Sequence, residues 1–118
     1  MLLADDSAKV RQSLSGLLSS LPGFEVVGEA QDGLEAIEFI KRLTPDLVIL
    51  DLRMPKLNGF EVLKALRQGE RSCKVIVFSA MTDDLCRQKC LELGVKHFFD
   101  KVTQFDEFLP AIKAMSPV

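Results

Sequence analysis

Short apolar runs alternate along the chain with longer stretches in which apolar and polar residues are mixed. The runs are rich in Val, Ile, Leu and Phe, and they cover residues 1–4, 24–30, 47–50, 74–79 and 97–100. Continuous apolar runs of this length, unlike strictly alternating ones, are typical of strands that are buried on both faces of a sheet. The pattern therefore predicts five short buried strands.

The segments between these runs carry apolar residues at three- and four-residue spacing, which predicts amphipathic helices. The stripe residues are Val10, Leu14, Leu17, Leu18 and Leu21 in the first segment, Leu34, Ile37, Phe39, Ile40 and Leu43 in the second, and Phe60, Leu63 and Leu66 in the third. Pro22-Gly23 and Pro45 end the first two helices. A final helix is predicted over residues 105–115, with Pro110 in its first turn, where a missing N–H does no harm.

Polar residues stand where these helices are expected to begin. Ser7 and Asn58 are suitable N-caps for the first and third helices, and either Thr82 or Asp83 can cap the fourth. Gly94 stands at the C-terminal end of that fourth helix. Helices therefore follow the first four strands, and the final helix follows the fifth.

Five strands that alternate with five helices predict an α/β protein with a parallel sheet and helices on both faces. Parallel strands bring their carboxyl ends to one edge, where open sheets of this class bind ligands. Asp5 and Asp6 follow the first strand, Asp51 follows the third, Ser79 ends the fourth and Lys101 follows the fifth. We therefore expect these distant residues to converge on one rim.

Length and composition exclude several classes of protein. The 118 residues leave room for one domain, and 47% hydrophobic with 27% charged residues is ordinary for a soluble globular chain. A net charge of -2 argues against direct nucleic-acid binding. No apolar run approaches the roughly 18 residues of a membrane span, and no signal-peptide pattern opens the chain. The three cysteines lack metal-site spacing and indicate free thiols, so we expect a cytoplasmic protein that binds no membrane.

The residues expected at the rim suit one kind of chemistry. Three crowded carboxylates repel one another unless a cation lies among them, and Mg²⁺ is the hard divalent ion that fits oxygen ligands best. A lysine and a hydroxyl on the same rim suit a phosphoryl group. Because an aspartate can form an acyl phosphate, Asp51 is the candidate nucleophile of a phosphoryl-transfer site.

A series of short motifs follows the chain in a fixed order. They are Leu2-Leu3-Ala4-Asp5-Asp6-Ser7, Gly28-Glu29-Ala30 with Asp32-Gly33 and Glu35-Ala36, Asp51-Leu52-Arg53-Met54-Pro55 with Asn58-Gly59, Ser79-Ala80, and Gly94 followed by Phe98-Phe99 and Lys101. In this order and at this spacing, the chain resembles the receiver domain of two-component response regulators, both DNA-binding and chemotaxis-type. The resemblance implies one receiver domain over residues 1–118, with a doubly wound, flavodoxin-like sheet of strand order 2-1-3-4-5.

The resemblance also implies roles for the acids. Asp51 would accept a phosphoryl group from a sensor histidine kinase, a histidine phosphotransfer protein or a small phosphodonor. Asp6 and Asp51 would bind Mg²⁺ together with the backbone carbonyl of Arg53, and Asp5 would bind it through a water molecule. The chain would thus catalyse its own phosphorylation and dephosphorylation rather than act as a conventional turnover enzyme.

Three further residues would read out the phosphorylation. Ser79 would donate a hydrogen bond to the phosphoryl group, and Lys101 would pair with it. Phe98, three residues before the lysine, stands where the family carries its switch aromatic. Movement of Ser79 and Phe98 would remodel the surface of the fourth helix, fifth strand and fifth helix. That surface would control an output domain or partner outside this chain, or a phosphorylation-dependent homodimer.

The chain departs from the family pattern at Val102 and at Phe98, which lacks the hydroxyl of the more common Tyr, so any switch there must work by packing alone. Val102 follows Lys101, where the family usually has proline, and we expect a trans bond there and a shifted loop because a cis bond before valine costs about 3 kcal/mol. Met81, two residues beyond Ser79, offers no group to orient an attacking water. We therefore expect slow self-dephosphorylation.

Two other functions stay open at this point. A receiver-like module could bind partners without being phosphorylated. An aspartyl-phosphate phosphatase of the dehalogenase type would also use Asp51, but such enzymes normally carry a second acid two residues later, where this chain has Arg53. The phosphoacceptor switch explains more of the rim residues than either alternative.

Overall fold

The computed structural model describes residues 1–68, 73–101 and 103–114 of the chain. Strands and helices alternate throughout these residues. The strands are β1 (Leu2–Ala4), β2 (Gly28–Ala30), β3 (Leu47–Leu50), β4 (Lys74–Ser79) and β5 (His97–Asp100), and the helices are α1 (Ala8–Leu18), α2 (Gly33–Leu43), α3 (Gly59–Gln68), α4 (Asp84–Glu92) and α5 (Phe105–Ala114).

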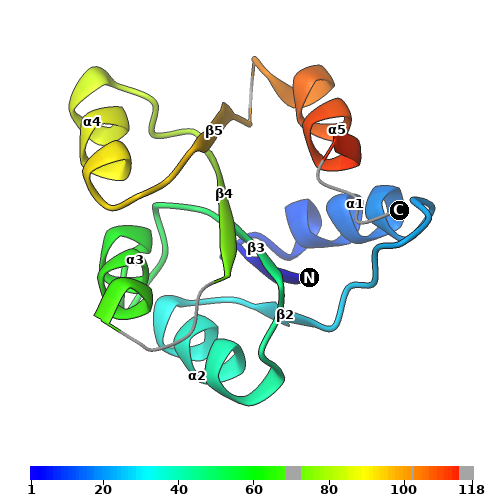
Figure 1. The fold of residues 1–118 in the computed structure, drawn as a ribbon, viewed down its shortest axis with the longest axis horizontal. Coiled ribbons are helices and arrows are strands. Elements are labelled where there is room, and N and C mark those ends of the chain that lie inside the picture. Colours follow the sequence, from blue (N-terminus) through cyan, green and yellow to red (C-terminus); the bar gives the residue numbers. More distant parts are fainter. Residues whose placement is uncertain (69–72, 102, 115–118) are drawn as a thin grey trace.

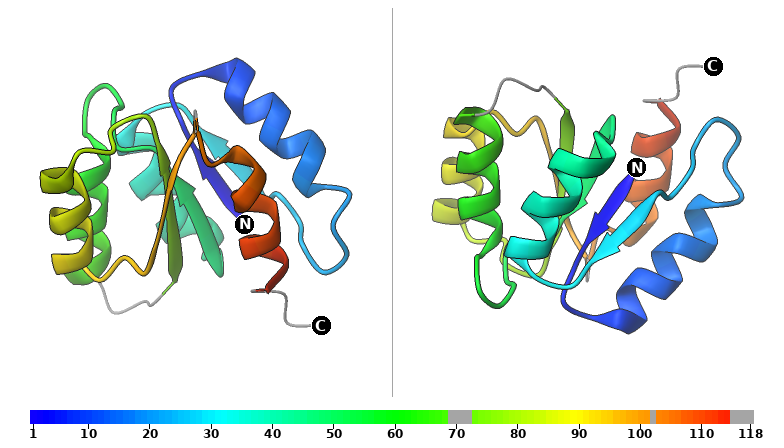
Figure 2. Two further views of the ribbon diagram at one scale, coloured as in Figure 1. Left: turned by 90° about the horizontal axis from the view of Figure 1, so that it is seen from above. Right: turned by 90° about the horizontal axis from the view of Figure 1, so that it is seen from below.

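The strands form one parallel sheet in the order β2-β1-β3-β4-β5, which confirms the predicted fold class and strand order. Leu3 of β1 lies opposite Glu29 of β2 on one side and Ile49 of β3 on the other. Helices α1 and α5 cover one face of the sheet, and α2, α3 and α4 cover the other (Figures 1 and 2). This is a doubly wound arrangement, in which every strand points its carboxyl end toward the same edge.

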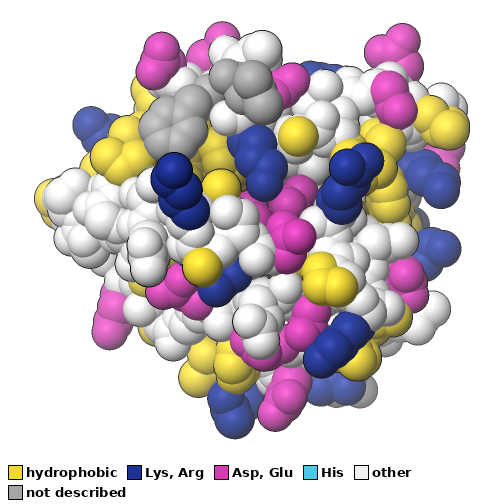
Figure 3. Space-filling view, turned by 180° about the vertical axis from the view of Figure 1, so that it is seen from behind, with side chains coloured by type: hydrophobic (Ala, Val, Ile, Leu, Met, Phe, Trp, Pro, Cys, Tyr) yellow, Lys and Arg dark blue, Asp and Glu magenta, His cyan; other side chains and the backbone are white. Residues whose placement is uncertain are grey.

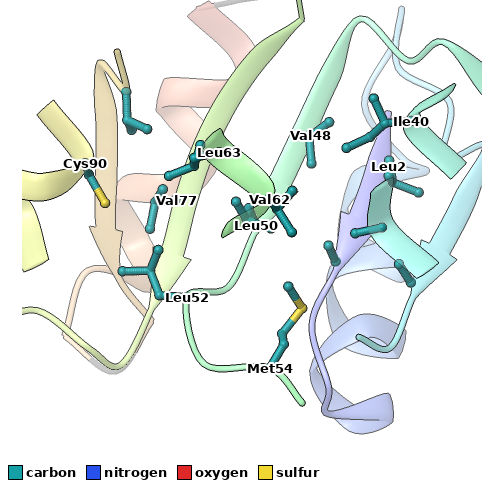
Figure 4. Packing of buried hydrophobic residues seen from close by; sticks show 14 of the residues in the cluster. Leu2, Ile40, Val48, Leu50, Leu52, Met54, Val62, Leu63, Val77 and Cys90 are labelled. Atoms are coloured by element: carbon teal, nitrogen blue, oxygen red, sulfur yellow. The ribbon is translucent and has the colours of Figure 1, made fainter. Parts of the chain in front are cut away.

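Two apolar layers separate the sheet from its helices, because neighbouring residues of a strand face opposite sides. We call the first the α1–α5 core. Its buried members are Met1, Leu3, Leu14, Leu18, Leu47, Ile49, Ile76, Phe78, Phe108 and Ile112. We call the second the α2–α4 core (Figure 4), and its buried members are Leu2, Ala4, Ala30, Ala36, Ile40, Val48, Leu50, Leu52, Met54, Val62, Leu63, Val77, Cys86, Cys90 and Val95.

The helix caps follow the sequence prediction closely. The Ser7 hydroxyl accepts from the Val10 amide at 3.3 Å, and the Asn58 side chain accepts from the Glu61 amide at 3.0 Å. For α4 the cap is Asp83, whose carboxylate accepts from the Cys86 amide at 2.8 Å. The Thr82 hydroxyl is engaged elsewhere, since it donates to the Asp100 carboxylate at 3.2 Å.

The second strand is shorter than the predicted run over residues 24–30. β2 begins at Gly28 because β1, its partner, begins at Leu2, which lies opposite Gly28. The residues before β2 make isolated hydrogen bonds instead of a strand ladder. The Val27 amide donates to the Met1 carbonyl at 2.9 Å, and the N-terminal ammonium donates to the Glu25 carbonyl at 2.9 Å.

The position predicted for Pro110 was wrong. Helix α5 begins at Phe105, so Pro110 lies in its second turn rather than its first. A proline there removes the helical N–H that would otherwise donate to the carbonyl of Asp106, four residues earlier. Met115, which we expected to end this helix, lies outside the described residues.

Candidate metal and phosphoacceptor site

The carboxyl ends of the strands bring the predicted acids together. The Asp5 amide donates to the Ala30 carbonyl at 3.0 Å, and the Asp51 amide donates to the Ala4 carbonyl at 2.9 Å. These bonds continue the sheet for one residue beyond β1 and β3 and place the two acids on neighbouring strand ends. Oxygens of Asp5, Asp6 and Asp51 all lie within 4.8 Å of one another.

The three acids differ in their exposure to solvent. Asp5 and Asp51 are only 3% and 4% exposed, whereas Asp6 is exposed at the rim. A buried carboxylate is costly unless it is paired or hydrogen-bonded. The site must therefore supply positive charge or donors to two of its three acids.

Lys101 supplies that charge. Its ammonium nitrogen lies 2.9 Å from Oδ2 of Asp5 and 3.1 Å from Oδ2 of Asp51. The Lys101 amide donates to the Ser79 carbonyl at 3.1 Å, which carries the pairing of β4 and β5 past Asp100 and points the lysine along the rim. Lys101 thus reaches the acids, and Val102, which follows it, lies outside the described residues.

Burial and the neighbouring charges shift the pKa values of Asp5 and Lys101. Burial raises the pKa of Asp5, although the hydrogen bonds from Lys101 and from the Ser7 amide act in the opposite direction. Desolvation alone would lower the pKa of Lys101, but the two carboxylates outweigh it and the pKa is raised. The lysine therefore stays charged between the acids.

Two donors orient the Asp51 carboxylate through its other oxygen. The buried Ser79 hydroxyl donates to Oδ1 of Asp51 at 2.8 Å and accepts from the Met81 amide at 3.1 Å. The Arg53 amide also donates to Oδ1, at 3.3 Å. Oδ1 is thus bound by the hydroxyl and the loop, while Oδ2 faces Lys101.

The donor set suits a hard divalent cation. Mg²⁺ prefers carboxylate, carbonyl and water oxygens and seldom binds to nitrogen or sulfur in proteins. The three acids offer such oxygens at one place. A space-filling view from behind Figure 1 shows acidic side chains near the middle of that face, with Lys and Arg side chains around them (Figure 3).

The chain matches a known protein family. The profile of the family described as "Response regulator receiver domain" matches residues 1–113. The chain belongs to this family. It is 34% identical over 116 residues to the chemotaxis protein CheY of Thermotoga maritima, an alignment that covers 98% of this chain and 96% of CheY.

A second relative is longer than this chain. The nitrate/nitrite response regulator protein NarL of Escherichia coli is 36% identical over 112 residues, which are 95% of this receiver but 52% of NarL. A receiver can therefore be a nearly whole protein or about half of one among these relatives. Among solved structures, a chain of the CheX–CheY–BeF3–Mg complex from Borrelia burgdorferi matches with a TM-score of 0.79 and 29% identity, covering 94% of this chain and 87% of that one.

One residue of this receiver was not anticipated from its sequence. Arg11 of α1 donates to the backbone carbonyl of Asp5, and its Nε lies 3.2 Å from a carboxylate oxygen of Glu29. The side chain is only 14% exposed, so it fastens the acidic loop after β1 to the edge strand β2. A basic residue four positions after the Ser7 cap was the available signal.

The candidate switch aromatic lies on the side of the α2–α4 core. Phe98 is partly buried against that core, and the guanidinium carbon of Arg87 lies 4.6 Å from its ring centroid. Arg87 Nε also donates to the Thr82 carbonyl at 3.3 Å. A cation over an aromatic face is attractive, so Arg87 connects the loop after Ser79 with the aromatic of β5.

The helices of the receiver are short relative to the thickness of a lipid bilayer. Within residues 1–68, 73–101 and 103–114, none of them has the length and apolar character that a membrane crossing requires.

Proposed function

We propose that this receiver is the phosphoacceptor switch of a two-component phosphorelay and that Asp51 accepts the phosphoryl group. The observation that supports this most directly is the environment of Asp51, which is 4% exposed and lies with two other acids, a hydroxyl and an ammonium group. The hydroxyl and the ammonium group would bind phosphoryl oxygens, and the two other acids would hold a cation that does the same. An acceptor that must hold a highly charged phosphoryl group would need them all.

The proposed reaction uses the described contacts. An oxygen of Asp51 attacks the phosphorus of a phosphohistidine, the bond between phosphorus and the imidazole nitrogen breaks, and an acyl phosphate forms. Ser79 and the Arg53 amide hold the carboxylate in place through Oδ1. Lys101 is close enough to Oδ2, at 3.1 Å, to pair with the incoming phosphoryl oxygens.

Mg²⁺ is the cofactor that we propose for this site. Asp6 and Asp51 would bind the ion directly with the backbone carbonyl of Arg53, and Asp5 would contribute through a water molecule. When bound, the ion supplies positive charge that neutralises the phosphoryl oxygens during transfer. The carboxylate oxygens within 4.8 Å of one another support this assignment.

The partners follow from the same proposal. A sensor histidine kinase or a histidine phosphotransfer protein would donate the phosphoryl group. The surface of α4, β5 and α5 would then change through Ser79 and Phe98 and act on an output domain or partner outside this chain, or pair two copies of the receiver. The NarL relative, of which this chain covers 52%, is consistent with an additional output segment.

Phosphorylation by acetyl phosphate tests the proposal directly. Wild type incubated with acetyl phosphate and Mg²⁺ should gain the mass of one phosphoryl group, and omission of Mg²⁺ should prevent this. Asp51→Asn should remain unlabelled. The matched control is Asp46→Asn, which changes an exposed acid immediately before β3 and should be labelled like wild type.

Two results would contradict this assignment. Labelling that persists in Asp51→Asn would place the acceptor elsewhere, and a wild type that is never labelled, even with a competent kinase, would favour a module that works without phosphorylation. Steady release of phosphate from added esters would favour the phosphatase instead.

We also propose that the phosphoryl group is lost slowly. Met81 is partly buried, and its amide donates to the Ser79 hydroxyl. Its side chain is apolar and therefore brings no polar group to an attacking water. Decay of the isolated phosphoprotein measures this. A half-life of seconds would contradict it.

A further inference from the structure

We propose that Gly33, at the start of α2, is a positioning residue for the cation site, because its missing side chain lets the loop after Asp51 lie close against α2. This inference rests on the proposed function, since it concerns the cation that Asp51 and the Arg53 carbonyl would bind. Gly33 itself would contact neither the cation nor the phosphoryl group. It acts through the loop between β3 and α3.

That loop is fixed at both of its ends. Leu52 and Met54 are 1% and 7% exposed, and both belong to the α2–α4 core (Figure 4). At the far end, the Gly59 amide donates to the Leu52 carbonyl at 2.9 Å. A Cβ atom on Gly59 would lie 2.6 Å from the Asp51 carbonyl oxygen, so α3 also begins in close contact with the start of the loop.

Gly33 contacts the middle of the loop. A Cβ atom at this position would lie 2.0 Å from the carbonyl oxygen of Leu57 and 2.6 Å from its carbonyl carbon. These are backbone atoms, which cannot rotate away as a flexible side chain can. The Gly33 amide also points at the loop and donates to the Pro55 carbonyl at 3.4 Å.

The backbone of Gly33 gives no other reason for glycine. It is the first residue of α2, and its φ is not in the left-handed region that favours glycine. The close approach of Leu57 is therefore what requires the missing side chain. The ion pair between Lys56 and Asp32, at 3.4 Å, adds a weaker link between the same two segments because the lysine side chain is 62% exposed.

Displacement of the loop would reach the cation site through Arg53. The Arg53 amide donates to Oδ1 of Asp51 at 3.3 Å, and Pro55, which accepts from Gly33, is only two residues away. Mg²⁺ demands nearly ideal octahedral geometry, so a small shift of a carbonyl ligand is costly. Changes in groups that orient metal ligands typically weaken metal binding about 10–100-fold.

The test compares two Gly→Ala variants in the same protein. In Gly33→Ala, the Mg²⁺ dissociation constant of the folded protein should rise about 10-fold or more. Gly16→Ala is the matched control, because Gly16 lies in α1 and a Cβ there would meet nothing within 4 Å. Mg²⁺ titration followed by NMR measures both. A folded Gly33→Ala that binds Mg²⁺ like wild type would overturn the inference.

A measurement on wild type decides the matter even if Gly33→Ala does not fold. During the Mg²⁺ titration, the Gly33 amide resonance should move with the same midpoint as the Arg53 amide, while the Gly16 amide stays in place. An Arg53 amide that moves without Gly33 would also overturn the inference and leave the proposed function intact. A wild type that binds no Mg²⁺ would overturn the cofactor assignment and this inference with it.

Discussion

The two apolar cores of this receiver hold the same sheet but extend to different places. Among the described residues, the buried members of the α1–α5 core lie on strands and helices or at Met1, just before β1, and the Phe108 ring packs near those of Phe78 and the partly buried Phe99. The α2–α4 core contains smaller residues, and it also includes Leu52 and Met54 from the loop after Asp51. Met81 and Phe98 pack against its edge.

The two cores therefore differ in whether their packing also positions the loop after Asp51. Within the described part of the chain, the buried residues of the α1–α5 core stabilise the fold and include none from the loops that follow Ala4, Leu50 and Ser79. Packing in the α2–α4 core stabilises the fold and, at the same time, fixes the backbone that carries the site. Substitutions of similar size in the two cores should therefore have similar effects on the free energy of unfolding and different effects on Mg²⁺ affinity.

The largest loss of stability is expected from Phe108→Ala in the α1–α5 core. Phe108 is fully buried, and its ring centroid lies 4.5 Å from that of Phe78 and 6.0 Å from that of Phe99. Its truncation should lower the free energy of unfolding by about 3–5 kcal/mol, as measured by urea denaturation. The Mg²⁺ affinity of the molecules that remain folded should be unchanged. A clear loss of affinity would contradict the expectation that only the α2–α4 core affects the cation site.

Leu52→Ala should show the double effect expected of the α2–α4 core. Leu52 is 1% exposed, and its loss should lower the free energy of unfolding by about 2–4 kcal/mol. Because Leu52 adjoins both Asp51 and Arg53, Mg²⁺ binding should weaken as well. Leu18→Ala, a fully buried leucine of the α1–α5 core, is the control and should lose stability alone.

Lys101→Met tests the rim that lies between the cores. Without Mg²⁺, it leaves Asp5 and Asp51 without the ammonium group that lies 2.9 and 3.1 Å from them. We expect a loss of about 2 kcal/mol at neutral pH, less than for a fully buried pair because the lysine is 17% exposed. Added Mg²⁺ should restore part of this stability. Lys96→Met, an exposed lysine, should have little effect.

The pH dependence of that variant has a definite sign. Burial raises the pKa of Asp5, so the folded state holds this proton more tightly than the unfolded state, and stability falls as the pH rises from the ordinary carboxyl pKa through the raised one. Removal of Lys101 should make this fall deeper. Wild type and Lys101→Met should therefore be closest in stability at acid pH, and equal separation at all pH values would speak against the pairing.

The smallest effect concerns thiol reactivity within the α2–α4 core. Cys86 and Cys90 are buried, and burial raises the pKa of Cys90 to about 11. Burial raises the pKa of Cys73 as well, but this thiol is only half-buried, so the reagent should reach it more easily and alkylate it faster at pH 8 than the other two. Timed alkylation followed by peptide mass spectrometry gives the order, and equal rates would indicate that this core opens easily.

Much of this molecule could be predicted because local patterns and a general rule of topology agree. The apolar runs locate β3, β4 and β5, and the caps Ser7 and Asn58 locate two helix starts. The convergence of the three acids follows from the parallel sheet alone. The common direction of the strands places Ser79 and Lys101 on the same rim, and the strand order implied by the family resemblance brings them next to the acids.

What the sequence did not reveal depends on contacts between distant side chains. The start of β2 is set by where β1 begins, and the turn in which Pro110 lies is set by where α5 begins. The hydrogen bond from Arg11 to the Asp5 carbonyl forms only when α1 lies against the sheet. The requirement for glycine at position 33 arises from the carbonyl of Leu57, which no local pattern near α2 encodes.

Lys101 gives the rim a counter-ion that cannot diffuse away. Dissolved cations screen buried acids only in proportion to their concentration, whereas a tethered ammonium group is present at the same local concentration in any medium. The chain therefore carries its own cation beside Asp5 and Asp51 when divalent ions are scarce. A divalent ion that bound as proposed would therefore meet two acids that already share the Lys101 ammonium group.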